Sequence, residues 1–373
     1  MPWILPILSF VLGWIAEKLF DILYTKVAIA WQNKKQRQLL SALGQDTDSL
    51  NILTIASGFP NFNSSTLQDA SITEKRLLLS PPTQMKEKFP ESVGRFSDED
   101  ISDFHLDLPK VSPEHMDKLI EQAKTEVAEG FAAKSKGLYF NGDMYGVLFA
   151  EGFSRTLDEE ESPILTIKLF KTDYFTHRVL EEVLSKVRIE TKSLTVAQLN
   201  SETLAPFRTS LGVSVVVILE NSNEILLTER SENAAYGTDS KNIYVSVTES
   251  FSSTDIDDYT KTPDFLLCVQ RGMFEELGIV RQDINEIDIL DMFFEKNHFQ
   301  DGIVAIAYVR SSITKSDIVS NRAKDRDLEI SKIFSIPNEK MKIKNFISAN
   351  KNSMKPQTIY SLRSYLARIS KTK

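Results

Sequence analysis

The sequence predicts an α/β protein in which a mixed β-sheet lies between helices, preceded by a small α+β region and an N-terminal apolar helix. After about residue 206, short β-branched apolar runs alternate with turn residues, one amphipathic helix interrupts them, and a second helix closes the chain. This order is typical of a mixed sheet covered by helices. With 373 residues, 42% of them hydrophobic and 26% charged, the chain is long enough for two globular domains.

The charge and the cysteine content exclude several classes of function. A formal net charge of −8 argues against a nucleic-acid-binding surface as the main purpose, because such domains are usually basic. The single cysteine, Cys268, excludes an intramolecular disulfide and a cysteine-rich zinc site, and it fits a reducing compartment. Its place on the apolar side of a predicted helix indicates a buried, inert thiol.

The first 31 residues differ from the rest of the chain. Residues 2–16 carry no charge, and apolar character resumes after three charged positions. Fifteen uncharged residues fall short of the roughly 20 that cross a bilayer, but the whole stretch suits a membrane anchor that spans or lies on the bilayer. Lys34, Lys35 and Arg37 follow directly, so the positive-inside rule predicts a cytoplasmic location for the bulk of the chain. A soluble amphipathic helix docked on the protein's own core is the alternative.

Residues 32–205 are predicted to form a small α+β region whose role the sequence does not indicate. A helix is predicted from Pro113 to Phe131, with Ser112 as its N-cap, and another ends at Val187. Strands are predicted over residues 52–55, 137–140, 145–150 and 164–170. His177 and Arg178 are able to contact a ligand phosphate, although a histidine beside aromatic residues is more often structural.

Residues 206–373 are predicted to form the second domain. Strands are expected over residues 212–219, 224–230, 243–247, 287–294, 302–309 and 330–336. The first two form a hairpin around a polar turn. A helix follows the third strand, with Thr262 as its cap, Pro263 in its first turn and Gly278 at its end. The closing helix is expected over residues 356–369.

The internal helix carries the run from Arg271 to Ile279, RGMFEELGI. This run resembles the second half of the Nudix box, Arg-Glu-apolar-any-Glu-Glu-any-Gly-apolar, at eight of nine positions. Flanking features are similar too: the strand that ends at Arg230, and Glu329 just before a late strand. The resemblance covers about 160 residues and implies a Nudix-type α/β/α sandwich that holds a nucleoside-diphosphate-like ligand.

The resemblance also implies roles for individual residues. Glu275 and Glu276 lie at the positions whose carboxylates hold Mg²⁺ (or Mn²⁺) against a diphosphate in the family, and Arg271 braces them. Glu249, at the end of a strand facing the helix, is the best substitute for a further ligand. Arg230 and Glu329 are expected to contact the nucleotide. The competing interpretation of Glu275 and Glu276 is an ordinary acidic pair on an exposed helix face.

Two departures weaken an enzymatic interpretation. Gly272 stands where the pattern has its first glutamate, and the glycine-rich first half of the box is missing. In its place is an acidic insertion whose aspartates, Asp255, Asp257 and Asp258, are possible further ligands but are interpreted as a solvated loop. Because glutamate is a better helix former than glycine, Gly272→Glu is expected to restore the carboxylate and stabilise the helix slightly.

Two functions therefore remain open. One is a membrane-tethered, Mg²⁺-dependent Nudix-type hydrolase that cleaves a nucleoside diphosphate linked to another moiety. The other is a catalytically weak, Nudix-like nucleotide sensor that signals to the N-terminal region or the membrane. In both the partner is a nucleotide-like small molecule and not a nucleic acid. The base, the leaving group and any homo-oligomer are left open.

Overall fold

The computed structural model describes residues 50–56, 69–89, 91–133, 140–153, 164–187, 189, 191, 193–231, 242–321 and 323–369. The predicted membrane-anchor helix at residues 1–31 and nearly all of the predicted strand at 137–140 lie outside these ranges. Within them, no helix is both long and apolar enough to cross a membrane.

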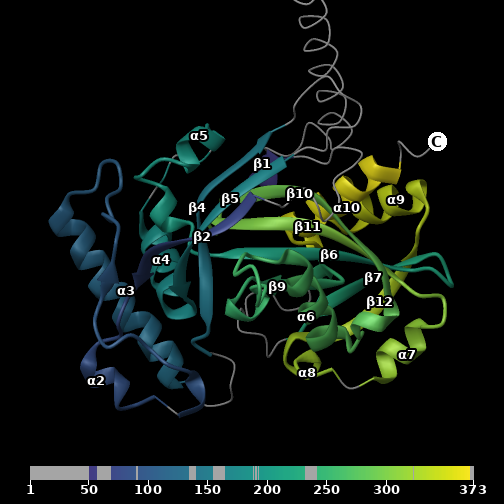
Figure 1. Cartoon of the computed structure of the whole chain (residues 1–373), viewed down its shortest axis with the longest axis horizontal. Coiled ribbons are helices and arrows are strands. Elements are labelled where there is room, and N and C mark those ends of the chain that lie inside the picture. The colour runs from purple at the N-terminus through teal and green to yellow at the C-terminus, as the bar shows by residue number, and fades with distance from the viewer. Residues whose placement is uncertain are drawn as a thin grey trace, which may run out of the picture.

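A large mixed sheet forms the centre of the C-terminal half (Figure 1). Its main path runs β1 (Ile52–Ala56), β10 (Ile284–Glu295), β11 (Gln300–Val309), β6 (Leu211–Leu219), β7 (Glu224–Arg230) and β12 (Ile330–Pro337), with β8 (Ile243–Val245) beside β7 and β9 (Val247–Ser250) beside β6. β11 and β6 are parallel, whereas β10 and β11 are antiparallel. The sheet is therefore mixed, as the sequence predicts.

Helices cover both faces of this sheet (Figure 1). The alternating side chains of β6 explain why. Val213 and Val215 pack into the core beneath α6 (Phe265–Leu277), whereas Val216 points to the opposite core, which α9 (Lys340–Asn350) and α10 (Pro356–Ile369) close. A strand buried on both faces reads as a continuous apolar run, and β6 has that composition. The result is a helix–sheet–helix sandwich.

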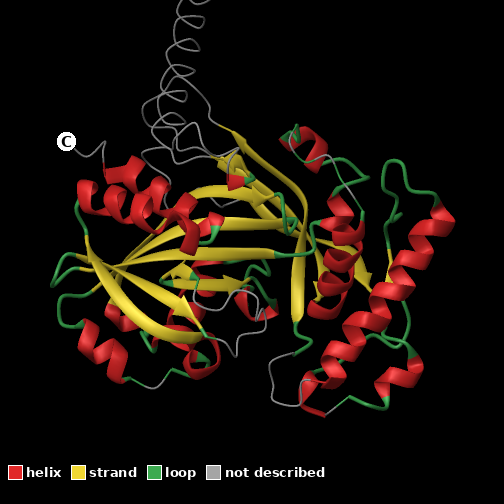
Figure 2. Ribbon diagram, turned by 180° about the vertical axis from the view of Figure 1, so that it is seen from behind, coloured by secondary structure: helices red, strands yellow, loops and turns green. Residues whose placement is uncertain are grey.

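A second, smaller sheet lies in the N-terminal half, with helices on one side of it (Figure 2). Its strand order is β3 (Ile101–Ser102), β2 (Asp69–Leu78), β5 (Ile164–Asp173) and β4 (Asp143–Phe153). The long helices α3 (Pro113–Ala133) and α4 (Tyr174–Lys186) pack together against it. Short helices complete the described chain: α2 (Thr83–Lys86), α5 (Val196–Leu199), α7 (Lys315–Ser320) and α8 (Arg326–Glu329), with 3-10 turns at Glu91–Val93, Ala205–Phe207, Ser253–Asp255, Arg281–Asp283 and Lys351–Ser353.

The two sheets share a core. Val147 of β4 and Val213 of β6 belong to one continuous cluster of buried apolar side chains. A fully buried ion pair lies at this junction, in which Arg208 Nη2 and Nε donate to the two carboxylate oxygens of Asp301 at 2.6 and 2.9 Å. The Val147 amide of β4 donates to the carbonyl oxygen of Arg208 at 2.8 Å, so the same residue contacts both sheets. β1 precedes the small sheet in the chain but pairs with β10 of the large one. Strand pairing thus crosses the division that the sequence suggests at residue 206.

The predicted bounds of β7 and α10 agree with the structure, but the start of α6 differs. The cap is Asp264 and not Thr262, because the Asp264 carboxylate accepts hydrogen bonds from the amides of Leu266 and Leu267 at 2.8 and 3.3 Å. Gly278 ends the helix with a φ of 70°, the left-handed conformation that glycine adopts without strain.

Candidate functional site

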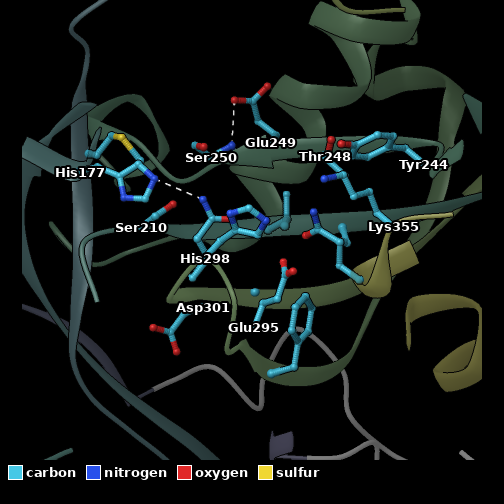
Figure 3. A pocket seen from close by; sticks show the side chains of 18 of the residues that line it. His177, Ser210, Tyr244, Thr248, Glu249, Ser250, Glu295, His298, Asp301 and Lys355 are labelled. Carbon is cyan, nitrogen blue, oxygen red and sulfur yellow. Dashed lines mark hydrogen bonds between the residues drawn. The ribbon is translucent and has the colours of Figure 1, made fainter. Parts of the chain in front are cut away.

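A cavity of about 160 Å³ lies between the two halves of the protein (Figure 3). The large sheet supplies most of its wall, from β6, β7, β9, β10 and β11. Two of the residues predicted to form the site, Arg230 and Glu249, line it. Arg271 instead borders an open hollow on the outer side of α6. The predicted site residues are therefore divided between a cavity and the structure behind it.

Arg271 is the centre of an ion-pair network, called here the Arg271 clamp. Its guanidinium donates to both carboxylate oxygens of Asp255, at 2.9 and 2.8 Å. Nη1 also pairs with Glu249 at 2.9 Å and with Glu275 at 3.2 Å. Nη2 donates to the carbonyl oxygen of Ser250 at 2.7 Å. Burial would lower the pKa of Arg271, but the hydrogen bonds to Asp255 and the charge of Glu249 raise it overall. The clamp ties α6 to the end of β9.

The interpretation of Asp255 as part of a solvated loop is wrong. Asp255 is buried, and besides holding Arg271 it accepts a hydrogen bond from the Ser252 amide at 2.9 Å. Asp257 lies in the surrounding loop and is bonded only to its own turn, through Thr260 and Tyr259. The three aspartates look alike in sequence. The distinguishing signal is the Ser-x-x-Asp spacing, which forms a capping box at this turn.

Glu275 and Glu276 have different environments although they are adjacent in sequence. Glu275 is half-buried and lies between Arg271 and Lys324, whose Nζ is 3.0 Å from Oε1. Glu276 is only 2% exposed and accepts a hydrogen bond from the Thr248 amide at 3.1 Å. Burial raises the pKa of Glu276 well above its usual range, and the nearby negative charges of Glu329 and Glu249 raise it further. The two carboxylates do not form one metal-facing pair.

Gly272 packs directly against β9. A Cβ built at this position would lie 2.7 Å from Cγ1 of Val247 and 2.9 Å from Cβ of Glu249. The close approach of helix and strand explains why a glycine occupies the middle of α6. It also means that the carboxylate of the Nudix pattern has no room here. Glu249, on the strand side of this contact, is mostly buried, and burial raises its pKa to about 7 against the opposing charge of Arg271.

The contacts of Glu249, Glu275 and Glu276 decide whether these side chains are able to bind the expected Mg²⁺ or Mn²⁺. In the described ranges, no group of three or more histidine, cysteine, aspartate or glutamate side chains is arranged to hold a metal ion. Glu249 and Glu275 share one guanidinium nitrogen of Arg271, and Glu276 accepts a backbone amide. This arrangement does not fit a metal bound by the three glutamates.

Arg230 and Glu329 form a pair with each other. Their side chains are 2.6 Å apart, and the Arg230 guanidinium lies 5.5 Å from the centre of the Tyr244 ring. Arg230 and Tyr244 line the cavity, whereas Glu329 is behind them and holds Arg230. Burial alone would lower the pKa of Arg230, but the negative charges of Glu329 and Glu276 raise it overall. Arg230 therefore presents a cation to the cavity.

The N-terminal half also contributes to the cavity, through Met144, Tyr174 and His177. His177 is 2% exposed; its Nδ1 is 3.1 Å from Thr209 Oγ1 and its Nε2 is 3.2 Å from Gln300 Nε2 (Figure 3). Burial lowers the pKa of His177 to about 4, so the ring is neutral near pH 7. The sequence leaves open whether His177 contacts a phosphate or is structural, and the structure places it in the cavity wall. Arg178 instead pairs with Glu181 on the same helix, 3.4 Å away.

Three further polar side chains line the cavity and carry no sequence signal of their own: His298, Gln300 and Lys355. They come from the β10–β11 hairpin and from the segment before α10, where polar residues are ordinarily interpreted as loop. Cys268, in contrast, is buried as the sequence predicts, and burial raises the pKa of its thiol well above the usual range.

Comparison with known proteins adds little to this geometry. No family description matches the chain, and no curated protein is significantly similar to it. Among solved structures, the MutT protein from Methanosarcina mazei Go1 is 16% identical, with a TM-score of 0.26, over 43% of this chain and 95% of that protein. The DR0079 protein from Deinococcus radiodurans is 14% identical, with a TM-score of 0.27, over 38% of this chain and 74% of that protein. Similarity at this level does not indicate what the chain binds.

Proposed function

We propose that this chain is a Nudix-like nucleotide-binding protein that takes a nucleoside-diphosphate-like ligand into the cavity between its sheets and hydrolyses it weakly or not at all. The observation that carries the proposal is the position of the cavity. It opens beside Thr248, Glu249 and Ser250, the end of the strand against which the Nudix-like helix packs.

The side chains around the cavity suit such a ligand. Arg230 and Lys355 line it and supply positive charge for a diphosphate. Tyr244 offers an aromatic face, and Gln300 and Ser210 offer the hydrogen-bonding groups that a base or sugar needs. Three carboxylates line the cavity as well: Glu249, which pairs with Arg271, Asp301, which pairs with Arg208, and Glu295. An overall acidic protein can bind such an anion where cations such as Arg230 and Lys355 set the local charge.

Weak turnover is supported by the Nudix-like helix itself. Gly272 lies where the pattern supplies a glutamate, and its contact with Val247 leaves no room for one. The Arg271 clamp neutralises Glu249 and Glu275 within the protein. Supplying or removing a positioned acid–base group changes a rate by roughly 10² to 10⁴. We therefore expect binding to survive and turnover to be low.

The test is to mix the full-length protein with a panel of nucleoside diphosphates and nucleoside diphosphate sugars, with and without Mg²⁺. Thermal shift measures binding, and formation of the nucleoside monophosphate measures turnover. A shift of several degrees for one ligand, with little or no product, supports the proposal. The absence of any shift across the panel would contradict it.

The alternative is the Mg²⁺-dependent hydrolase, favoured by the retained spacing of Arg271, Glu275 and Glu276. Hydrolysis would add water across the diphosphate, so that one P–O bond of the bridging oxygen breaks and a nucleoside monophosphate leaves. Rapid turnover that requires Mg²⁺ and is lost in Glu276→Gln would favour this function. Glu249→Gln is the companion variant, since Glu249 lines the cavity and pairs with Arg271 of the Nudix-like helix.

We also propose that residues 1–31 tether the chain to a membrane on its cytoplasmic side. The support is the uncharged stretch and the basic residues that follow it. The full-length protein should sediment with membranes after a carbonate wash, whereas a chain that begins at Lys34 should remain in the supernatant. Full-length protein recovered without detergent in the soluble fraction would contradict the tether.

A further inference from the structure

We propose that His298 and Glu181 form an anion-binding pair in the cavity, in which Glu181 from the N-terminal half holds His298 against the phosphate group of the ligand. This inference rests on the proposed nucleotide binding and names the part of the site that recognises the phosphate. It also gives the N-terminal half a role in the site.

The geometry of the pair carries the inference. His298 lies in the hairpin between β10 and β11 and lines the cavity (Figure 3). Its Nδ1 is 3.0 Å from Oε1 of Glu181, which lies on α4. Because Glu181 occupies Nδ1, Nε2 is the ring nitrogen that remains for a ligand. A carboxylate that fixes one nitrogen of a histidine also fixes the orientation of the other.

The charged and titratable groups around His298 are Glu181 of α4, Glu295 of β10, Lys355 before α10 and the neutral His177 of α4, with Arg178 of α4 beside Glu181. Their combined effect raises the pKa of His298. The hydrogen bond to Glu181 raises the pKa of His298, and the negative charge of Glu295 raises it further. Burial and the positive charge of Lys355 lower the pKa, but by less. With its ring charged, His298 donates from Nε2 and joins Arg230 and Lys355 as a third cationic side chain in the cavity wall.

The pair crosses the boundary between the two halves. Residues 181 and 298 are 117 positions apart, and α4 packs on the small sheet whereas the hairpin belongs to the large one. A ligand that strengthens the charge on His298 also strengthens its bond to Glu181. Binding in the cavity is thereby linked to the contact between the halves.

The test is calorimetric titration of the full-length protein with inorganic pyrophosphate and with ADP, between about pH 6 and pH 8, the range in which histidine titrates. Three proteins are compared with wild type: His298→Gln, Glu181→Gln and, as a matched control, His115→Gln. His115 is an exposed histidine on α3 that does not line the cavity. Because the probes titrate as well, the readout at each pH is the difference between variant and wild type.

We expect His298→Gln to bind both probes about tenfold more weakly at the lower pH, the effect of losing one charge-assisted hydrogen bond. Glu181→Gln should move the pH midpoint of this extra affinity downward, a change that a purely structural role would not produce. The control should match wild type. Thermal unfolding checks that each variant is folded, and His298→Gln, at a half-exposed turn, remains the test if Glu181→Gln does not fold.

Two results would overturn the inference, and they differ in what they say about the proposed function. If wild type binds ADP and both variants bind it equally well with the same pH profile, His298 does not contact the phosphate, although the proposed function stands. If wild type binds neither probe at any pH, the inference and the proposed function both fail.

Discussion

Replacing Gly272 by alanine should destabilise the protein, although alanine is the better helix former. The added Cβ would lie 2.7 Å from Cγ1 of Val247, a fully buried, β-branched side chain that has little freedom to turn away. Overpacking of this kind costs about 1–3 kcal/mol, whereas helix propensity returns about 1 kcal/mol. The expected net loss is therefore up to about 2 kcal/mol.

Urea unfolding and thermal unfolding both measure this change. A loss of 1 kcal/mol lowers the Tm by roughly 2–4 °C in a domain of this size. Gly130→Ala is the matched control, because Gly130 is also a glycine within a helix, α3 of the N-terminal half. The control should gain stability, by about 0.5–1 kcal/mol. A Gly272→Ala protein as stable as wild type, or more so, would refute the packing explanation.

Gly272→Glu should be less stable still, because the same Cβ contacts apply to a longer side chain. This reverses the sign expected from the sequence, where only helix propensity and the missing carboxylate were considered. It also means that low turnover in this variant would say little about catalysis unless its fold is checked first.

Three further predictions concern buried charges. Arg271→Gln should lower the free energy of unfolding in urea by about 3–5 kcal/mol, because the buried Asp255 carboxylate loses both of its guanidinium hydrogen bonds. A decrease below about 1 kcal/mol would show that the Arg271 clamp does not stabilise the fold. Asp301→Asn should cost a similar amount, since Arg208 would be left buried without its carboxylate; a loss below about 1 kcal/mol in urea unfolding would contradict this. Burial lowers the pKa of His177 from its ordinary 6.5 to about 4, so between these values the unfolded chain binds more protons than the folded one. The free energy of unfolding should therefore fall as the pH is lowered from 6.5 to about 4, and His177→Gln should flatten that slope.

The fold was predictable where the signal is local. β7 and α10 agree with the predicted bounds because an alternating or helical apolar pattern lies between clear turn residues. The parallel pairing of β6 with β11 and the addition of β1 beside β10 were not predictable. These contacts join segments far apart in the chain, and apolar periodicity says which faces are buried but not which strands are neighbours.

The candidate site was likewise predictable only where its residues are close together in the sequence. The resemblance located Arg271, Glu275 and Glu276 on one helix, and helical spacing alone brings Arg271 to Glu275. Sequence did not indicate that Gly272 is fixed by Val247, or that Asp255 holds Arg271. Contacts of this kind depend on how closely a helix approaches a strand, which no local pattern encodes.

The contribution of the N-terminal half to the cavity was even harder to predict from the sequence. Glu181 and His298 each look like an ordinary surface residue in sequence, and only the packing of the two halves brings them together. A single histidine in a hairpin has no sequence pattern that distinguishes a binding residue from an ordinary surface residue.

The most direct test of ligand binding with weak turnover is a phosphorus NMR spectrum of the full-length protein mixed with one equivalent of a nucleoside diphosphate and Mg²⁺. One spectrum reports both events, because binding shifts or broadens the two phosphate signals and hydrolysis creates monophosphate signals. We predict shifted or broadened diphosphate signals that persist for hours without product. Sharp signals at their free positions would contradict binding, and prompt conversion to monophosphate would contradict weak turnover and favour the hydrolase.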